Sequence, residues 1–129
     1  MRKSWPKQAI EKLELLKRWR EFSLIVAKAA KEILRDSLKA VYVVGSIAEG
    51  KATVYSDIDI AIVVNSIELK NIDVAIDIKL KAEELGLPIN TPLDIKIITE
   101  DEFRKYLGKI YRKAIEIQID GKQQLSEHL

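Results

Sequence analysis

The chain has 129 residues, of which 47% are hydrophobic and 33% are charged, as in ordinary soluble globular proteins. This length fits one domain over residues 1–129, with enough buried surface for a real core. The absence of cysteine and the single histidine exclude disulfides, thiolate catalysis and metal sites built on Cys or His. Any chemistry must therefore use carboxylates, hydroxyls and amines.

The charge pattern bears on partners and location. The net charge is only +2, and the Lys and Arg residues are interspersed with acids, which disfavours a nucleic-acid partner. No run of about 18 apolar residues is present to cross a membrane. Residues 1–17 lack the uninterrupted apolar segment of a secretory signal. We therefore expect a cytoplasmic protein with no membrane contact.

The first predicted element is a long helix over about residues 6–38. Pro6 suits a first helical turn, and apolar residues follow at alternating spacings of four and three. These residues are Leu15, Trp19, Phe22, Val26, Ala29 and Ile33. The stripe predicts packing against a sheet, and its spacing also permits a seam with another helix.

Two apolar runs predict strands in the first half of the chain. The β-branched run at residues 40–44 ends at Gly45, which indicates a strand followed by a turn. Residues 58–64 are apolar at almost every position, which is typical of a central strand covered by helices on both faces.

A second helix is predicted over residues 70–85, with Gly86 as its C-terminal cap. Its periodicity favours Asp73 and Asp77 on the solvent side. The residues expected to face inward are Ile72, Ala75, Ile76 and Leu80.

The C-terminal third predicts two strands and one helix. The run LDIKIIT at residues 93–99 indicates a strand, and Thr99 with Glu102 forms a capping-box signature for a helix over residues 100–107. Apolar and polar residues alternate over residues 115–119, which favours an edge strand. Tyr106 and Tyr111 lie in no motif, and we interpret them as packing or surface residues. Helices alternating with strands indicate an α/β or α+β sheet layered with helices.

Two aspartates stand at the start of the predicted central strand. Asp57 and Asp59 are two residues apart, so their side chains share one face, about 7 Å apart along the strand. Paired carboxylates of this kind can hold two divalent cations for a phosphoryl-type displacement. Oxygen ligands favour Mg²⁺ or Mn²⁺.

A third carboxylate, Asp94, lies near the start of the strand at residues 93–99. If that strand neighbours residues 58–64, Asp94 can join the other two as a metal ligand and as the general base for an acceptor hydroxyl. Lys96 shares its face. It can neutralise Asp94 as an ion pair or contact substrate phosphates.

Gly45 and Ser46 form a candidate phosphate-binding turn. Exposed backbone N–H groups at such a turn attract phosphate oxygens, and Gly45 allows close approach while Ser46 can donate its hydroxyl. The Walker pattern GxxxxGK[ST] is absent. Ser56 is expected to hydrogen-bond locally or to cap the strand entry. It is counted with Lys96 among the candidate nucleotide-binding residues.

The order and spacing of these residues, GSIAEGKATVYSDID at residues 45–59, resemble the DNA polymerase β-like nucleotidyltransferase superfamily. The closer form GSxAxGxAxxxSDID is similar to the minimal nucleotidyltransferase (MNT) proteins. The resemblance implies a mixed β-sheet flanked by α-helices, ATP or another NTP with two Mg²⁺ ions, and transfer of a nucleotidyl group, AMP in the case of ATP. By position, Gly45 and Ser46 would hold the β- and γ-phosphates, Asp57 and Asp59 the metals, and Asp94 the catalytic base.

The resemblance also implies a partner. Many relatives of this size pair with a small helical HEPN protein as the antitoxin of a toxin–antitoxin module, some by adenylylating the toxin. Two hypotheses follow: a nucleotidyltransferase acting on such a partner, or an antitoxin-type binding module with a vestigial or regulatory nucleotide site. Relatives commonly carry arginine where Ile47 and Glu49 stand, and Glu49 would repel a triphosphate unless it points away. The chain has no second domain to close the cleft, so a partner subunit or a homo-oligomer is expected to supply that wall.

Overall fold

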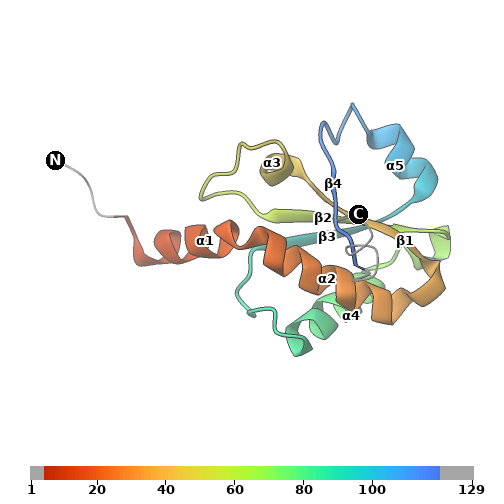
Figure 1. Cartoon of the computed structure of the whole chain (residues 1–129), viewed down its shortest axis with the longest axis horizontal. Helices are drawn as coiled ribbons and strands as arrows, with labels where there is room; N and C mark the ends of the chain where they lie inside the picture. Colours follow the sequence, from red (N-terminus) through yellow and green to blue (C-terminus); the bar gives the residue numbers. More distant parts are fainter. Residues whose placement is uncertain (1–4, 120–129) are drawn as a thin grey trace, which may run out of the picture.

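The computed structural model describes residues 5–119, and its centre is a four-stranded mixed sheet in the order β3–β2–β1–β4 (Figure 1). The strands are β1 (Leu38–Val44), β2 (Ile58–Val64), β3 (Leu93–Thr99) and β4 (Ile115–Glu116). Strand β2 pairs in parallel with β3 and antiparallel with β1, which pairs antiparallel with β4. The predicted fold, a mixed sheet flanked by helices, is confirmed.

Helices cover both faces of this sheet. Helices α2 and α4 pack on one face, and α5 packs on the other (Figure 1). The helical segments are α1 (Lys7–Lys17), α2 (Trp19–Leu34), α3 (Gly45–Ala48), α4 (Ile72–Glu84) and α5 (Glu100–Tyr106), with 3₁₀ turns η1 (Arg35–Ser37) and η2 (Ile67–Leu69). In residues 5–119 no helix combines the length and apolar character needed to cross a bilayer.

Strand β2 is buried on both faces, as its sequence predicts. Ile58, Ile60 and Ile62 belong to the larger core under α2 and α4. Ala61 and Val63 point to the opposite face and pack in a smaller cluster with residues of α5. A strand with this pattern can lie only between two covered faces.

The long N-terminal helix predicted over residues 6–38 is wrong in two places. The helix is interrupted at Arg18, between α1 and α2. The N–H of Arg18 donates to the carbonyls of Leu15 and Leu16, and its guanidinium pairs with Glu21 at 2.9 Å. At the other end, Arg35 adopts a positive φ of 51°, and β1 begins at residue 38. The apolar stripe runs on across the first break, so periodicity alone does not reveal it.

The expected inward face of α4 is right for Ala75, which is half-buried against the larger core, and wrong for the other three residues. Ile78 and Ala82 are fully buried, whereas Ile72, Ile76 and Leu80 are 74%, 47% and 55% exposed. The cause is that α4 carries apolar residues on two opposite sides, and a 3.6-residue period fits either side equally well.

Other features of α4 agree with prediction. Asp73 and Asp77 are exposed. Gly86 follows the helix with φ 116°, and the N–H of Leu87 donates to the carbonyl of Ala82 at 2.9 Å. This is a Schellman cap, so the predicted cap is confirmed.

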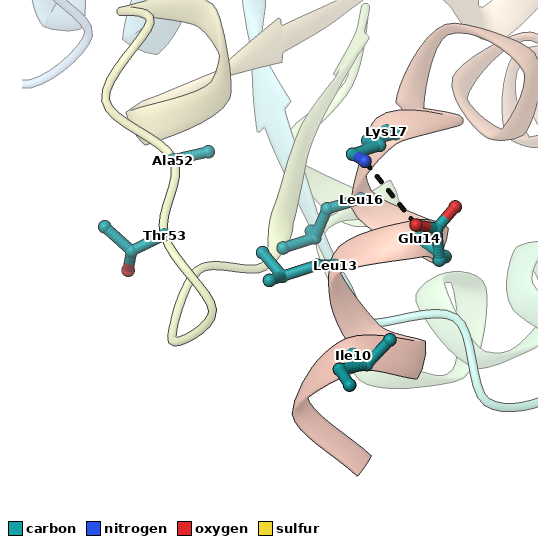
Figure 2. Close-up of a pocket in the computed structure, with 7 residues that line it drawn as sticks. All are labelled: Ile10, Leu13, Glu14, Leu16, Lys17, Ala52 and Thr53. Carbon is teal, nitrogen blue, oxygen red and sulfur yellow. Dashed lines mark hydrogen bonds and ion pairs between the residues drawn. The ribbon is translucent and has the colours of Figure 1, made fainter. Parts of the chain in front are cut away.

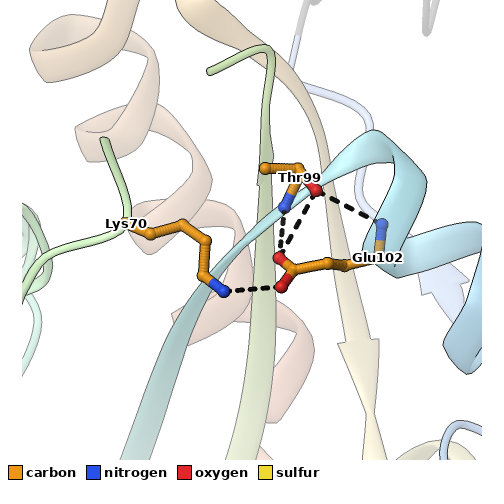
Figure 3. Close-up of polar contacts among 3 residues, drawn as sticks. All are labelled: Lys70, Thr99 and Glu102. Carbon is orange, nitrogen blue, oxygen red and sulfur yellow. Dashed lines mark hydrogen bonds and ion pairs between the residues drawn. The ribbon is translucent and has the colours of Figure 1, made fainter. Parts of the chain in front are cut away.

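The capping box of α5 is present, and a lysine extends it (Figure 3). Thr99 Oγ1 accepts from the N–H of Glu102 at 3.2 Å, and Glu102 Oε1 accepts from the N–H of Thr99 at 3.0 Å. Lys70 Nζ donates to Glu102 Oε2 at 2.6 Å. The start of α5 is therefore tied both to the end of β3 and to the segment that precedes α4.

The predicted edge strand over residues 115–119 is shorter than expected. Only Ile115 and Glu116 form β4, paired with Val43 and Tyr42. The N–H of Ile117 still donates to the carbonyl of Val41 at 2.9 Å. The chain thus leaves the edge of β1 after a brief pairing.

Candidate active site

The parallel register of β2 and β3 places Asp59 directly beside Asp94. The expectation that these two strands are neighbours is confirmed. Asp57 lies one residue before β2 and two before Asp59, at the same end of the sheet. Ala61 and Ile98, which continue the face of Asp59 and Asp94, pack under α5, so the site lies on the α5 side of the sheet.

The electrostatics of Asp59 reflect this crowding. Its pKa is raised to about 6, first by burial and then by the negative charges of Asp94 and Asp57. The ammonium of Lys96 opposes the rise, and a hydrogen bond with the Asp94 carboxyl adds to it. A further positive charge near Asp59, in addition to that of Lys96, would therefore be favourable.

Each of the other two carboxylates has a lysine beside it. Lys12 Nζ lies 3.8 Å from Asp57 Oδ1, and Lys96 Nζ lies 3.4 Å from Asp94 Oδ2. The ion pair that was one of the two roles open to Lys96 is thus formed. Both ion pairs are partly exposed, so each carboxylate can exchange its lysine for another cation at a small cost in free energy.

The backbone at Gly45 lies directly against the Asp59 side chain. Its φ is 73°, and a Cβ added to it would lie 2.1 Å from Asp59 Oδ2. The antiparallel register of β1 and β2 sets Val44 opposite Asp59, which explains why the next residue reaches the carboxylate. Only glycine satisfies both the dihedral angle and the space.

The turn after Gly45 is the short helix α3. Ser46 is half-buried, and its carbonyl accepts from the N–H of Lys51 at 2.8 Å. Glu49 is paired with Lys51 at 3.8 Å, so a cation offsets the acid that departs from the motif. The contact of Gly45 and Ser46 with phosphate stays a prediction.

Ser56 makes the local contact that was expected of it. Its Oγ accepts from the N–H of Thr53 at 2.9 Å, and its own N–H donates to the carbonyl of Thr53 at 3.0 Å. The two bonds close the loop that delivers Asp57 to the sheet. Its part in nucleotide binding stays a prediction.

Tyr111 is near the site although no motif marks it. The residue is 6% exposed, and its ring stands edge-on to Tyr106 with 5.6 Å between the ring centroids and packs in the cluster on the α5 face. Burial first, then Tyr106 and the charges of Asp59 and Asp94, raise its pKa. The turn that brings it back uses the N–H of Tyr111 and the carbonyl of Tyr106 at 2.9 Å. The interpretation as a packing residue is right for the ring.

Lys12 is a second residue that sequence reasoning did not select. It sits on α1, more than forty positions from Asp57, and only the tertiary fold brings the two together. Its spacing within the helix carries no signal of this contact.

The residues present suit Mg²⁺ by chemistry. The donors are carboxylates, the ligands that Mg²⁺ prefers, and the mutual repulsion at Asp59 is what a divalent cation would offset. Within residues 5–119, no three acidic or histidine side chains are gathered closely enough to hold a metal ion as they stand. Asp57 and Asp94 would have to exchange their lysine partners for the ion.

Comparison with known proteins gives a family match. The family described as nucleotidyltransferase domain matches residues 25–120, well over half of the chain. A solved protein from Sulfolobus solfataricus, titled a "putative nucleotidyltransferase", is 26% identical over 88% of this chain and 88% of that chain, with a TM-score of 0.48. A comparison with curated proteins found no match.

Proposed function

The chain belongs to the nucleotidyltransferase domain family, and on that premise we propose that it transfers AMP from ATP to an acceptor hydroxyl with the help of Mg²⁺. The observation that carries the proposal is the register that sets Asp59 beside Asp94, with Gly45 packed against the Asp59 carboxylate. Acidic residues crowded in this way are costly unless cations share the site.

The carboxylates would divide the work by position. Asp57 and Asp59 would hold two Mg²⁺ ions, with Asp94 as a further ligand. When bound, the ions would supply positive charge that offsets the charge building on the phosphate oxygens. The backbone at Gly45 and the hydroxyl of Ser46 would hold the triphosphate tail, with Ser56 fixing the loop between them and Asp57.

The transfer step balances as follows. The acceptor oxygen forms a bond to the α-phosphorus, and the bond between that phosphorus and the bridging oxygen to the β-phosphate breaks. Pyrophosphate leaves, and the proton of the acceptor hydroxyl passes to the Asp94 carboxylate. Lys96, which pairs with Asp94 at 3.4 Å, would steady the carboxylate or a phosphate oxygen. Alignment and charge neutralisation would provide most of the rate gain.

A second candidate function is an antitoxin-type binding module for a small helical protein of the HEPN kind. It is favoured by the exposed apolar row on α4, formed by Ile72, Ile76 and Leu80, each of which is about half exposed or more. Exposed apolar rows of this kind are typical of protein contact surfaces. In this function the nucleotide site would be vestigial or regulatory.

Incubation with ATP labelled at the α-phosphate tests the first function. The protein is mixed with Mg²⁺, the label and the product of the adjacent gene, and both proteins are examined for covalent label. We expect label that Asp57→Asn and Asp94→Asn abolish and that Asp73→Asn, an exposed change on α4, preserves.

The result also separates the two functions. Unlabelled proteins that still form a stable complex, unaffected by Asp57→Asn, would overturn the transferase and support the binding module. Full transfer by the Asp57→Asn variant would contradict the assigned mechanism.

A further inference from the structure

Helix α1 lies outside the family match yet reaches the candidate active site. The match covers residues 25–120, whereas α1 spans residues 7–17. Its Lys12 is 3.8 Å from Asp57. This helix therefore precedes the matched residues in the sequence and stands beside the acidic residues of the site.

A cavity of about 340 Å³ lies between α1 and the loop that leads to Asp57 (Figure 2). Ile10, Leu13 and Leu16 form one wall, and Ala52 and Thr53 form the other. The lining is mostly apolar, and the volume falls within the range of small-molecule sites.

Two charged side chains add polar groups to this lining. Glu14 and Lys17 line the cavity and pair with each other at 3.5 Å (Figure 2). Both are well exposed, so the pair is weak and can open toward a ligand. Apolar walls with a few polar groups are typical of small-molecule binding sites.

The position of the cavity favours the donor side of the reaction. The loop with Ala52 and Thr53 joins the Gly45 turn to Asp57, and both ends of it belong to the proposed nucleotide-holding part. Asp94, the proposed base for the acceptor, lies on β3, which contributes no residue to the cavity.

We propose that this cavity receives the nucleobase of the donor nucleotide, with α1 as one of its walls. The assignment rests on the proposed nucleotidyl transfer. The ring would lie between the aliphatic side chains of α1 and Ala52, and the Glu14 carboxylate would accept a hydrogen bond from an exocyclic amino group, as adenine carries. No bond is made or broken in this pocket.

Filling the cavity tests the proposal in the full-length protein. Ala52→Trp places an indole in the space from an exposed loop position, and Ile10→Glu introduces a charge from the opposite wall. Tyr55→Trp is the matched control, because Tyr55 lies in the same loop, is 90% exposed and does not line the cavity. Circular dichroism and melting curves show that each variant is folded.

The readout is the affinity for ATP and for inorganic tripolyphosphate, each titrated calorimetrically with Mg²⁺. We expect the unmodified protein and Tyr55→Trp to bind ATP at least about tenfold more tightly than tripolyphosphate, because the base buries apolar surface. Ala52→Trp and Ile10→Glu should remove this preference and leave tripolyphosphate affinity unchanged.

The possible results separate the two proposals. Unchanged ATP preference in both filled variants would overturn the base pocket and leave the proposed transfer intact. If the filled variants kept their ATP affinity and lost only transfer to the acceptor, the base pocket would also be overturned. The cavity would then be a binding site for the acceptor. If the unmodified protein bound neither ATP nor tripolyphosphate, the proposed function and this inference would fail together.

Discussion

Gly45 and Asp59 are in such close contact that a single methyl group on Gly45 would stand 2.1 Å from the Asp59 carboxylate oxygen. Gly45→Ala should therefore destabilise the fold for two reasons, since alanine at φ 73° costs about 1–2 kcal/mol and the clash adds to it. We expect a lower midpoint in urea unfolding and loss of ATP binding.

Gly50→Ala provides the control for this effect. Gly50 has nearly the same φ, 75°, with nothing within 4 Å of its missing Cβ, so it should show the dihedral cost alone. Adding Asp59→Ala to Gly45→Ala should recover part of the stability lost. Equal destabilisation by the two glycine variants would contradict the steric contact.

The raised pKa of Asp59 predicts a pH-dependent stability. The folded protein holds the Asp59 proton up to about pH 6, whereas the unfolded chain releases it near its usual value of 3.8. This contribution to stability is therefore present at low pH and is lost as pH rises through about 6. Asp59→Asn removes the titrating charge, so its melting temperature should exceed that of the unmodified protein by more at about pH 7.5 than at about pH 5. A pH-independent difference between the two proteins would argue against the crowding of acids.

If the folded carboxylates hold Mg²⁺, as proposed, and the unfolded chain does not, Mg²⁺ should stabilise the protein. We expect the melting temperature to rise with Mg²⁺ concentration and to fall again with EDTA, by roughly 4 °C for each 1 kcal/mol of binding. Asp57→Asn and Asp94→Asn should weaken this response, while Asp73→Asn on α4 should not. An identical rise in all variants would indicate only an ionic-strength effect.

The capping box predicts a local stability effect at α5. Thr99→Ala removes the side-chain acceptor for the N–H of Glu102 and should cost about 1 kcal/mol, measured by urea unfolding. Glu102→Gln keeps an oxygen for the N–H of Thr99 but loses the charge pairing with Lys70, so its cost should be smaller. The reverse order would show that Lys70, not the cap, anchors the helix.

The sheet was predictable because its signals are local. Strands β2 and β3 occupy the residues that their apolar runs indicate, and the spacing of Thr99 and Glu102 fixes where α5 begins. Asp59 and Asp94 followed from the alternation of side chains once the two strands were taken as neighbours.

The failures have a different cause. Helix α4 carries apolar residues on two sides, and only its packing on α2 selects Ile78 and Ala82 over the Ile76 side. The break at Arg18 depends on local bonding that leaves the apolar stripe intact. Lys12 and Tyr111 reach the site through the tertiary fold, which no spacing in the sequence encodes.

Strand β2 contributes both core residues and a residue of the candidate active site within seven residues. Its isoleucines, Ile58, Ile60 and Ile62, pack in the larger core. Asp59 points to the opposite face, where the candidate active site lies. Deleting one residue within the strand would exchange the two sets, placing the carboxylate in the larger core and turning isoleucines toward the α5 face. Transfer of this acidic site to another protein would therefore require the whole of β2, because core residues and the site residue alternate along the strand.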